Sequence, residues 1–214
     1  SQPLVEQSIW ALGNIAGDST KARDYCLHSG AVAPVAACIS SANSSLSVLR
    51  NGVWTLSNFC RGKPKPKMAQ VAPILAVAKT YLYTTDHEVL CDLAWALSYM
   101  SDGPNENIAA VLKTGVAPRL IKLLAHPMST IVTPALRTCG NIVSGNDSQT
   151  QLMLDCGLLA SVIPLISHTK LSIQKEANWA VSNITAGNRK QIKAVVDSGI
   201  LPKIIQRYGS ANVG

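Results

Sequence analysis

The stretch Trp10-Ala-Leu-Gly-Asn14 returns four times along the chain, as Trp54-Thr-Leu-Ser-Asn58, Trp95-Ala-Leu-Ser-Tyr99, Arg137-Thr-Cys-Gly-Asn141 and Trp179-Ala-Val-Ser-Asn183. Successive copies begin 44, 41, 42 and 42 residues apart. A glycine keeps the same step at Gly30, Gly115, Gly157 and Gly199, and in three of these places a proline follows within four residues. The sequence is therefore built from repeated units of about 42 residues.

The length of the unit points to one class of repeat. Armadillo and HEAT repeats, made of two or three helices, have about 40–47 residues, whereas ankyrin and tetratricopeptide units are shorter. The glycine would end one helix and the proline would open the next in its first turn. No segment alternates apolar and polar residues as a strand does. We expect an all-α fold, a right-handed superhelical solenoid of armadillo repeats, with residues 1–214 as a single domain of about five repeats whose terminal repeats are incomplete.

Composition excludes several classes of protein. With 47% hydrophobic residues among 214, the chain can bury a core without disulfides or metals. The cysteines form no C-x-x-C pair and no histidine stands at metal-ligand spacing, so we expect reduced, buried thiols and neither a metal nor a cofactor. No stretch approaches 18 uninterrupted apolar residues, so we expect no membrane partner. The cysteines are Cys26, Cys38, Cys60, Cys91, Cys139 and Cys156.

No catalytic motif appears in the sequence. It has no G-x-G-x-x-G, no P-loop and no H-E-x-x-H, and its four histidines fall near expected turns between helices. Cys139 lies on the apolar side of its helix, where a thiol is usually inert. We therefore expect a protein that is not an enzyme.

A helical wheel separates the tryptophans from the core. With Trp10 at 0°, Asn14 falls at about 40°, while the apolar residues of the same helix fall between about 140° and 260°. Large aromatic residues at helical spacing usually belong to the core, but here a core stripe exists without them. That stripe comprises Val5, Ile9, Leu12, Ile15 and Ala16, and in later repeats Val53, Leu56, Phe59, Ala94, Leu97, Met100, Leu136, Cys139, Ile142, Val181 and Ile184.

The side opposite the core suits an extended basic peptide. Asparagine amides can both donate to and accept from a peptide backbone, and lysine or arginine stems fit between indole rings such as that of Trp95. Asp92 and Glu176 precede their tryptophans by three residues, in line with this face, and Glu88 is near it. Asp18, Asp102 and Asp147 follow the same helices, near C-terminal ends that favour cations.

The net charge of +7 offers a competing interpretation as a nucleic-acid binder. The basic residues, however, gather away from the tryptophans, above all in a proline-rich loop from Arg61 to Lys67 that replaces the glycine of the second repeat. We expect these cations on the outer surface and no direct nucleic-acid contact. Two alternatives remain open: an armadillo scaffold that binds other partner tails, and a nucleic-acid-binding α-solenoid.

Long stretches of the sequence resemble the armadillo domain of importin-α. They are EQSIWALGNIAGDS (6–19), LRNGVWTLSNFCRGKP (49–64), LAWALSYMSDGPNENI (93–108), IVTPALRTCGNIVSGND (131–147) and IQKEANWAVSNITAG (173–187). Tyr99 and Arg137 also stand where the family has tyrosine and arginine in place of the repeated asparagine and tryptophan. The resemblance implies a nuclear import adaptor, cytoplasmic and nuclear, that binds Lys/Arg-rich nuclear localisation signals in two patches.

The resemblance also implies which residues form each patch. The larger patch would comprise Trp10, Asn14, Asp18, Trp54 and Asn58, with Gln7, Asn51 and Arg61 beside them. The smaller patch would comprise Arg137, Asn141, Ser144, Glu176, Trp179, Ser182 and Asn183, with Tyr99 and Asp102 on its flank. A two-part signal would span both, and Asp18 would pair with the most selective lysine of the ligand.

The same resemblance predicts what the chain leaves out. It opens at Ser1 without a methionine and would correspond to the third to seventh repeats of the family, so we expect a fragment with weakened binding at both patches. The family recruits importin-β through an N-terminal autoinhibitory segment, which we expect to be absent here.

Overall fold

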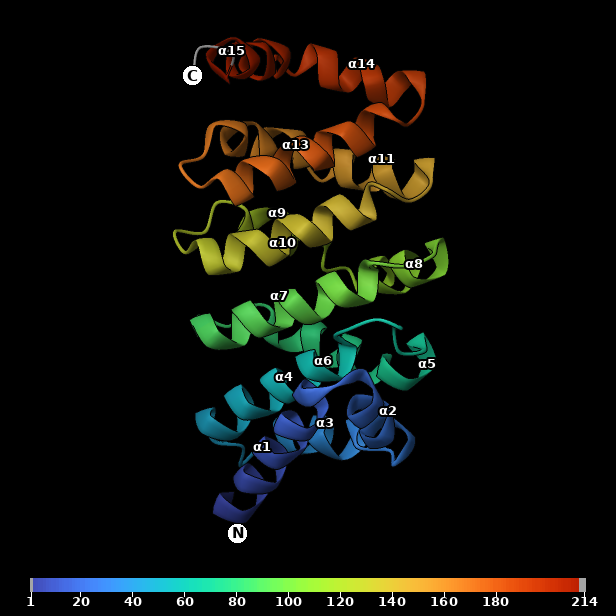
Figure 1. Ribbon diagram of the computed structural model, residues 1–214, viewed down its shortest axis with the longest axis vertical. Helices are drawn as coiled ribbons and strands as arrows, with labels where there is room; N and C mark the ends of the chain where they lie inside the picture. Colours follow the sequence, from blue (N-terminus) through green and yellow to red (C-terminus); the bar gives the residue numbers. More distant parts are fainter. Residues whose placement is uncertain (1, 212–214) are drawn as a thin grey trace. The chain divides into compact units, whose positions relative to one another are not determined.

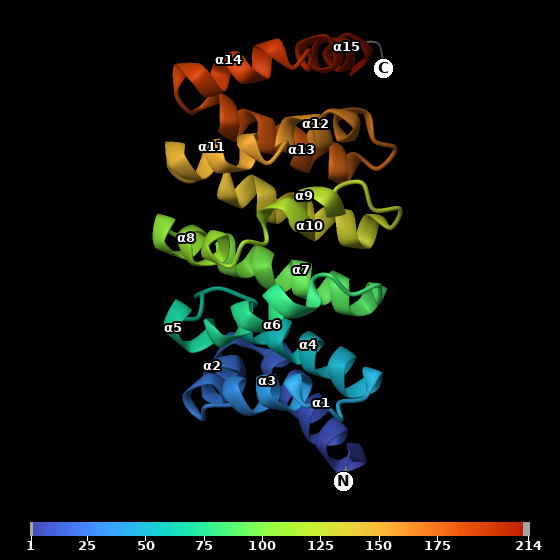
Figure 2. The ribbon, with the colours of Figure 1, turned by 180° about the vertical axis from the view of Figure 1, so that it is seen from behind.

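The computed structural model describes residues 2–211 of the protein, and no strand occurs within them (Figures 1 and 2). The all-α prediction is confirmed. The elements are α1 Gln2–Asp18, α2 Thr20–His28, α3 Val32–Ser40, α4 Leu46–Cys60, α5 Met68–Val71, α6 Pro73–Tyr81, α7 His87–Ser101, α8 Asn105–Lys113, α9 Ala117–Leu123, α10 Ser129–Ile142, α11 Asp147–Asp155, α12 Leu158–Val162, the 3-10 helix η1 Ile163–Ser167, α13 Leu171–Thr185, α14 Arg189–Asp197 and α15 Leu201–Ala211.

Each repeat consists of a long helix followed by shorter ones. The long helices α1, α4, α7, α10 and α13 each carry one copy of the pentapeptide. The glycine between the two helices that follow has a positive φ, between 73° and 88° at Gly30, Gly115, Gly157 and Gly199. Only glycine adopts this left-handed conformation without strain, so the chain can turn sharply at these four points. The turn predicted from the Gly–Pro spacing is confirmed.

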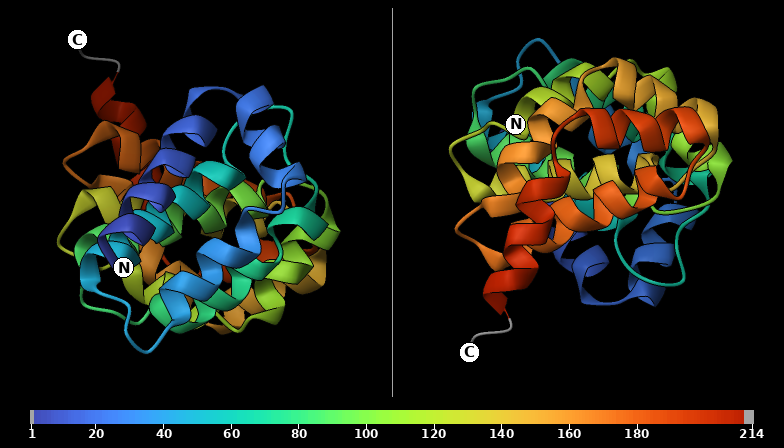
Figure 3. Two further views of the ribbon diagram at one scale, coloured as in Figure 1. Left: turned by 90° about the horizontal axis from the view of Figure 1, so that it is seen from below. Right: turned by 90° about the horizontal axis from the view of Figure 1, so that it is seen from above.

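The described chain divides into two compact units. The first contains residues 2–100 and 113–116, and in it α4 packs against α1, α2 and α3, while α3 also contacts α6 (Figure 3, left). The second contains residues 101–112 and 117–211, and in it α10 packs against α9 and α13, while α13 also contacts η1 and α14 (Figure 3, right). The single domain expected for residues 1–214 stays a prediction, and residues 1 and 212–214 lie outside the described part.

The core stripe read from the helical wheel is buried in four of the five repeats. Its members on α4, α7, α10 and α13 are at most 4% exposed. On α1 the stripe is less complete, because Val5 and Leu12 are half-buried and Ile15 is 47% exposed. The prediction that Ile15 is a core residue is wrong, because its side chain lines a surface hollow beside α2. Burial of this position requires a neighbouring element, which the periodicity of α1 alone does not reveal.

The cysteines are all free thiols, but they differ in burial. Cys26, Cys60 and Cys139 are buried as expected, whereas Cys38, Cys91 and Cys156 are only half-buried. Burial raises the pKa of the Cys139 thiol to about 12 and raises that of Cys60 as well. These two thiols stay protonated near neutral pH and are therefore poor nucleophiles.

No single helix within residues 2–211 is long and apolar enough to cross a bilayer. One pair, Asp147–Asp155 with Leu158–Ser167, meets the criterion together but is bent by 71°. Met153, Leu158 and Ile166 of this pair are fully buried in the repeat, as core helices of the second unit.

Candidate peptide-binding site

Two of the four indole rings, those of Trp54 and Trp179, lie over glycines of the preceding repeat. A Cβ atom on Gly13 would come within 2.7 Å of Cε3 of Trp54, and a Cβ atom on Gly140 would come equally close to Cε3 of Trp179. Each glycine occupies the fourth position of its pentapeptide. The absence of a side chain there lets the next long helix bring its indole ring close to the backbone, and neither ring is fully buried.

None of the four tryptophans is buried. Trp10 is 49% exposed and Trp179 is 37% exposed, while Trp54 and Trp95 are half-buried. Trp95 stacks on Tyr99 of its own helix, with ring centroids 5.7 Å apart and an interplanar angle of 23°. We call the side of the long helices that carries these rings the tryptophan face. It offers aromatic surface on which the aliphatic stem of a basic side chain can lie.

The repeated asparagines also bind the preceding repeat. Nδ2 of Asn58 donates to the carbonyl oxygen of Gly13 at 3.2 Å, and Nδ2 of Asn183 donates to that of Gly140 at 3.0 Å. Nδ2 of Asn141 donates to Oγ of Ser101 at 3.2 Å. Asn58 and Asn141 are only 6% exposed, whereas Asn14 is exposed. The amides therefore join successive long helices, a role that the sequence reasoning missed, and a carboxamide making one such bond still has a second N–H and an acceptor oxygen.

A hollow at the end of α1 brings several predicted residues together. We call it the Asp18 hollow. It unites Asn14 and Asp18 of the first repeat with Trp54, Asn58 and Arg61 of the second. Its full lining is Gly13, Asn14, Gly17, Asp18, Trp54, Asn58 and Arg61.

The two charged residues of this hollow, Asp18 and Arg61, do not form an ion pair with each other. Asp18 is the last residue of α1, is exposed, and has no basic side chain within ion-pair distance among residues 2–211. Arg61 is exposed and likewise has no carboxylate partner in the described chain. An exposed carboxylate beside an indole and two carboxamides can accept a cationic group together with the peptide backbone that carries it.

Farther along the first unit, Arg50 forms ion pairs with two acidic side chains. Its guanidinium lies 2.7 Å from Oδ2 of Asp86 and 2.9 Å from Oε1 of Glu88. These hydrogen bonds and charges lower the pKa of Asp86. Arg50 precedes Trp54 by four residues and hence lies on the same face of α4. This spacing is the sequence signal that could have placed a cation near the acids that precede Trp95.

Asp92 remains as a half-buried carboxyl group next to this cluster. Burial, and then the negative charge of Glu88, raise the pKa of Asp92 to about 6. The ionised form of a partly buried carboxyl group is destabilised because it loses hydration. A cation that binds beside it would stabilise that ionised form. Asp92 therefore remains a candidate contact for a basic ligand.

In the second unit the acid and the base of the tryptophan face pair with each other. Arg137 donates through Nε to Oε2 of Glu176 at 2.6 Å and through Nη2 to Oε1. The Glu176 side chain is only 15% exposed. The hydroxyls of Ser144 and Ser182 donate to carbonyl oxygens of their own turn, those of Asn141 and Trp179. A cation that binds here must share Glu176 with Arg137.

The remaining predicted residues occupy varied positions. Gln7 is exposed on α1, and Asp102 is exposed just after α7. Nδ2 of Asn51 donates to Oε1 of Glu6 at 3.2 Å, so this amide also joins two repeats. Within residues 2–211, no group of three or more histidine, cysteine or acidic side chains could hold a metal ion.

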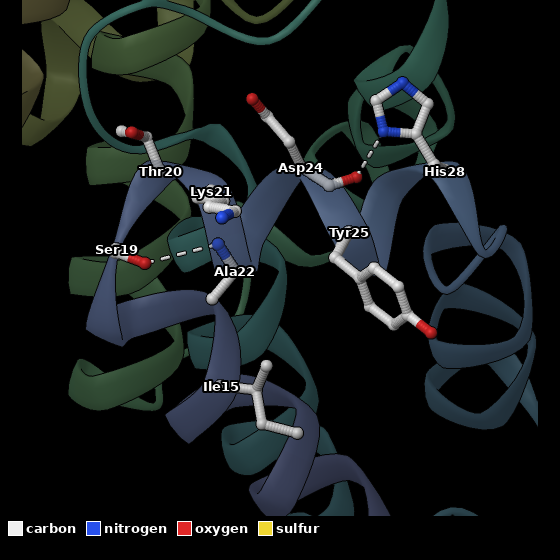
Figure 4. A pocket seen from close by; sticks show the side chains of 8 residues that line it. All are labelled: Ile15, Ser19, Thr20, Lys21, Ala22, Asp24, Tyr25 and His28. Carbon is white, nitrogen blue, oxygen red and sulfur yellow. Dashed lines mark hydrogen bonds between the residues drawn. The ribbon is translucent and has the colours of Figure 1, made fainter.

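A second hollow in the first unit is apolar and lies beside α2 (Figure 4). Tyr25, 74% exposed, and Ile15 form its apolar part, and the imidazole of His28 bonds to the backbone oxygen of Asp24. Ile15 corresponds to positions that later repeats bury completely. This hollow is thus an uncovered repeat face rather than part of the tryptophan face. Its lining is Ile15, Ser19, Thr20, Lys21, Ala22, Asp24, Tyr25 and His28.

Comparison with known proteins agrees with the fold. A family model described as the armadillo/beta-catenin-like repeat matches residues 104–144 and 146–186. A computationally designed armadillo repeat protein for modular peptide recognition matches with a TM-score of 0.88 and 23% identity, covering 96% of this chain and 86% of that chain. Another, in complex with the peptide (KR)4, matches with a TM-score of 0.82 and 24% identity, over 94% and 83% of the two chains. The chain has the armadillo-repeat fold, and residues 104–144 and 146–186 match the family model of that repeat.

Its curated relatives are importin α subunits. Importin subunit alpha-1b of Oryza sativa subsp. japonica is 52% identical over 155 residues, which are 72% of this chain and 29% of that protein. Importin subunit alpha-3 of Arabidopsis thaliana is 51% identical over 155 residues, 72% of this chain and 29% of that protein. The probable importin subunit alpha-A of Dictyostelium discoideum is 45% identical over 153 residues, 65% of this chain and 28% of that protein. The resemblance to importin-α is confirmed, and the chain spans less than a third of these relatives.

Proposed function

We propose that the chain is the cargo-binding part of a nuclear import adaptor and holds Lys/Arg-rich nuclear localisation signals on its tryptophan face. The relatives support the adaptor role, because their names describe importin α subunits. The observation that carries the peptide-binding site is the Asp18 hollow, where an unpaired carboxylate lies beside Trp54 and two asparagines. We place the protein in the cytoplasm and the nucleus, as this role requires.

The hollow can bind three parts of a lysine residue at once: its aliphatic stem, its ammonium group and its backbone. The aliphatic stem lies against the exposed part of the Trp54 ring, where apolar contact and cation–π attraction contribute about 0.5–2 kcal/mol. The ammonium group reaches the Asp18 carboxylate in a charge-assisted hydrogen bond. The remaining amide groups of Asn14 and Asn58 bind the peptide backbone, which fixes the ligand without reading its other side chains. Selectivity for a cation then depends mainly on Asp18.

The second unit holds a weaker version of the same site. Trp179 supplies exposed indole and Asn183 a half-buried amide, but Glu176 is already bound by Arg137. An incoming lysine gains only part of the carboxylate's charge, since the guanidinium keeps the rest. This difference assigns the larger share of affinity to the Asp18 hollow, in a protein that acts by binding rather than by catalysis.

A titration with three ligands tests the proposal. The chain is titrated with a lysine-rich peptide, a glutamate-rich peptide of equal length and a single-stranded RNA, and tryptophan fluorescence is followed at low salt and at about 0.15 M salt. We expect saturable binding of the lysine-rich peptide alone at the higher salt concentration. Binding of RNA alone, or of the acidic peptide in competition with the basic one, would refute the proposed function.

A further inference from the structure

The loop from Arg61 to Lys67 joins α4 to α5 and concentrates positive charge. Its sequence, Arg-Gly-Lys-Pro-Lys-Pro-Lys, places a lysine at every second position and contains no acid. Lys63 and Lys67 are exposed, and Lys65 is half-buried. Only Arg61 takes part in the Asp18 hollow. The three lysines, which we call the lysine loop, have no role in the proposed peptide site.

A buried arginine fixes this loop to α2. Arg23 is 1% exposed, and its guanidinium donates to the carbonyl oxygen of Arg61 at 2.6 Å and to that of Pro64 at 2.7 Å. Its charge is balanced by the neighbouring Asp24, whose Oδ1 lies 2.7 Å from Nη2. Burying a guanidinium is unfavourable unless its hydrogen bonds are satisfied, so the two loop carbonyls are part of what makes Arg23 stable in the core.

Backbone contacts hold the loop at further points. Gly62 has a φ of 101° and packs against Thr20, where a Cβ atom would come within 2.7 Å of Cγ2. The amide of Arg61 donates to the carbonyl of Asn58 at 3.2 Å, and the amide of Lys67 donates to Oε1 of Gln70 at 3.3 Å. The loop is therefore positioned at its beginning, middle and end before any ligand binds.

The two exposed lysines of the loop, Lys63 and Lys67, lack a carboxylate partner within ion-pair distance in the described part of the chain. Like charges held close together repel one another, and a fixed loop cannot spread them apart. An anionic ligand would relieve that repulsion, and it would lose little affinity to ordering because the loop is already in place.

We propose that the lysine loop is a docking surface for an acidic peptide segment that binds independently of the basic ligand. Arg61 and Lys67 both have extended backbones, with φ and ψ of −80° and 148° and of −65° and 135°. Between these two residues the chain bends at residues 62–64, so the exposed Lys63 and Lys67 offer positive charge at two fixed points, to which carboxylates of a flexible acidic segment can adapt. Three lysines neutralise few phosphates and the loop contains no aromatic ring, which disfavours nucleic acid.

Fluorescence anisotropy tests this proposal on the whole chain. The probe is a fluorescein-labelled peptide of alternating glutamate and serine, and the variant is Lys63→Gln/Lys65→Gln/Lys67→Gln. The matched control removes the same charge from exposed positions in the second unit, as Arg189→Gln/Lys190→Gln/Lys203→Gln. A labelled oligothymidylate of similar charge is the second probe. Thermal unfolding of all three proteins verifies that they remain folded.

We expect the loop variant to lose roughly tenfold in affinity for the acidic peptide, and the control variant less than threefold. The affinity of both variants for a lysine-rich peptide should equal that of the original chain, which separates this surface from the Asp18 hollow. Equal losses in both variants would show that only net charge matters and would overturn the proposal. Tighter binding of oligothymidylate than of the acidic peptide, or no binding of the peptide to the original chain, would also overturn it.

Discussion

The ring of Trp54 lies against the backbone of Gly13, and the carbonyl of that same glycine accepts the amide of Asn58. Two side chains of one repeat thus use a single residue of the preceding repeat. Trp179 and Asn183 repeat the arrangement on Gly140. In these two copies the pentapeptide is therefore more than a ligand-binding motif. Its first and fifth residues pack onto the glycine at the fourth position of the copy before it, which explains why glycine occurs inside α1 and α10.

This relationship predicts opposite effects for two glycines of α1. Gly13→Ala should destabilise the protein by about 1–3 kcal/mol, because the new methyl group overlaps the Trp54 ring. Gly17→Ala is the matched control, since its Cβ atom would meet only the flexible end of Asn58 at 3.3 Å. Alanine favours a helix over glycine by up to about 1 kcal/mol, so this control should be neutral or stabilising. Urea denaturation measures both, and equal losses would contradict the packing described for Trp54.

The sequence predicted those features that depend on periodicity. Leu56 and Leu136 are fully buried as the helical wheel requires, and Trp10 is exposed as it requires. It did not predict Ile15, whose burial depends on a neighbouring element rather than on its own helix. It also missed Arg23, because nothing near this residue shows that carbonyl groups 38 and 41 positions later need a donor.

Among the candidate site residues, the sequence predicted which kinds of side chain lie on the tryptophan face better than it predicted which of them bind to one another. Asp18 and Trp54 do line one hollow. Glu176 was predicted to face a ligand, but it already binds Arg137 across 39 residues, and Asn51 is engaged by Glu6 across 45. Such pairs depend on how successive repeats are stacked. The wheel of a single helix places each residue on a face without showing which neighbour reaches it.

Asp92 makes the stability of the fold depend on pH. Its pKa of about 6 in the folded chain exceeds its ordinary value of 3.8, so the charged form destabilises the fold above pH 6 and stability is regained as the pH falls from 7 toward 4. Asp92→Asn should stabilise the protein at pH 8 by roughly 1–2 kcal/mol, less than the full shift would give because the group is only partly buried, and should have no effect below pH 4.

Chemical denaturation at pH 4, 6 and 8 measures this effect, with the exposed Asp155→Asn as a control that should show little pH-dependent difference. A basic ligand requires the ionised form of Asp92, so its affinity should fall between pH 7 and pH 5 in the original chain and less in Asp92→Asn. An Asp92→Asn difference that stays constant from pH 4 to pH 8 would contradict a raised pKa.

Arg23 should be essential for holding the lysine loop. Arg23→Met keeps the length of the side chain but leaves the carbonyls of Arg61 and Pro64 without their donor, which should cost about 2–4 kcal/mol. The loop should also open to trypsin after Arg61 and Lys67, so limited proteolysis measures it directly. Lys21→Met, an exposed change two residues away on the same helix, is the control and should leave the cleavage rate unchanged. Equal cleavage rates for Arg23→Met and the original chain would contradict the anchoring role.

The most direct measurement is the affinity of a lysine-rich peptide for Asp18→Lys, determined by titration calorimetry beside Asp155→Lys. Both aspartates are exposed and end a helix, so the two variants change net charge equally and leave the core untouched. We predict that Asp18→Lys weakens binding by at least about tenfold, that Asp155→Lys changes it by less than about threefold, and that glutamate at one lysine position of the peptide restores part of the lost affinity. An unchanged affinity in Asp18→Lys, or the same loss in both variants, would contradict the assignment of the Asp18 hollow as the cation-binding site.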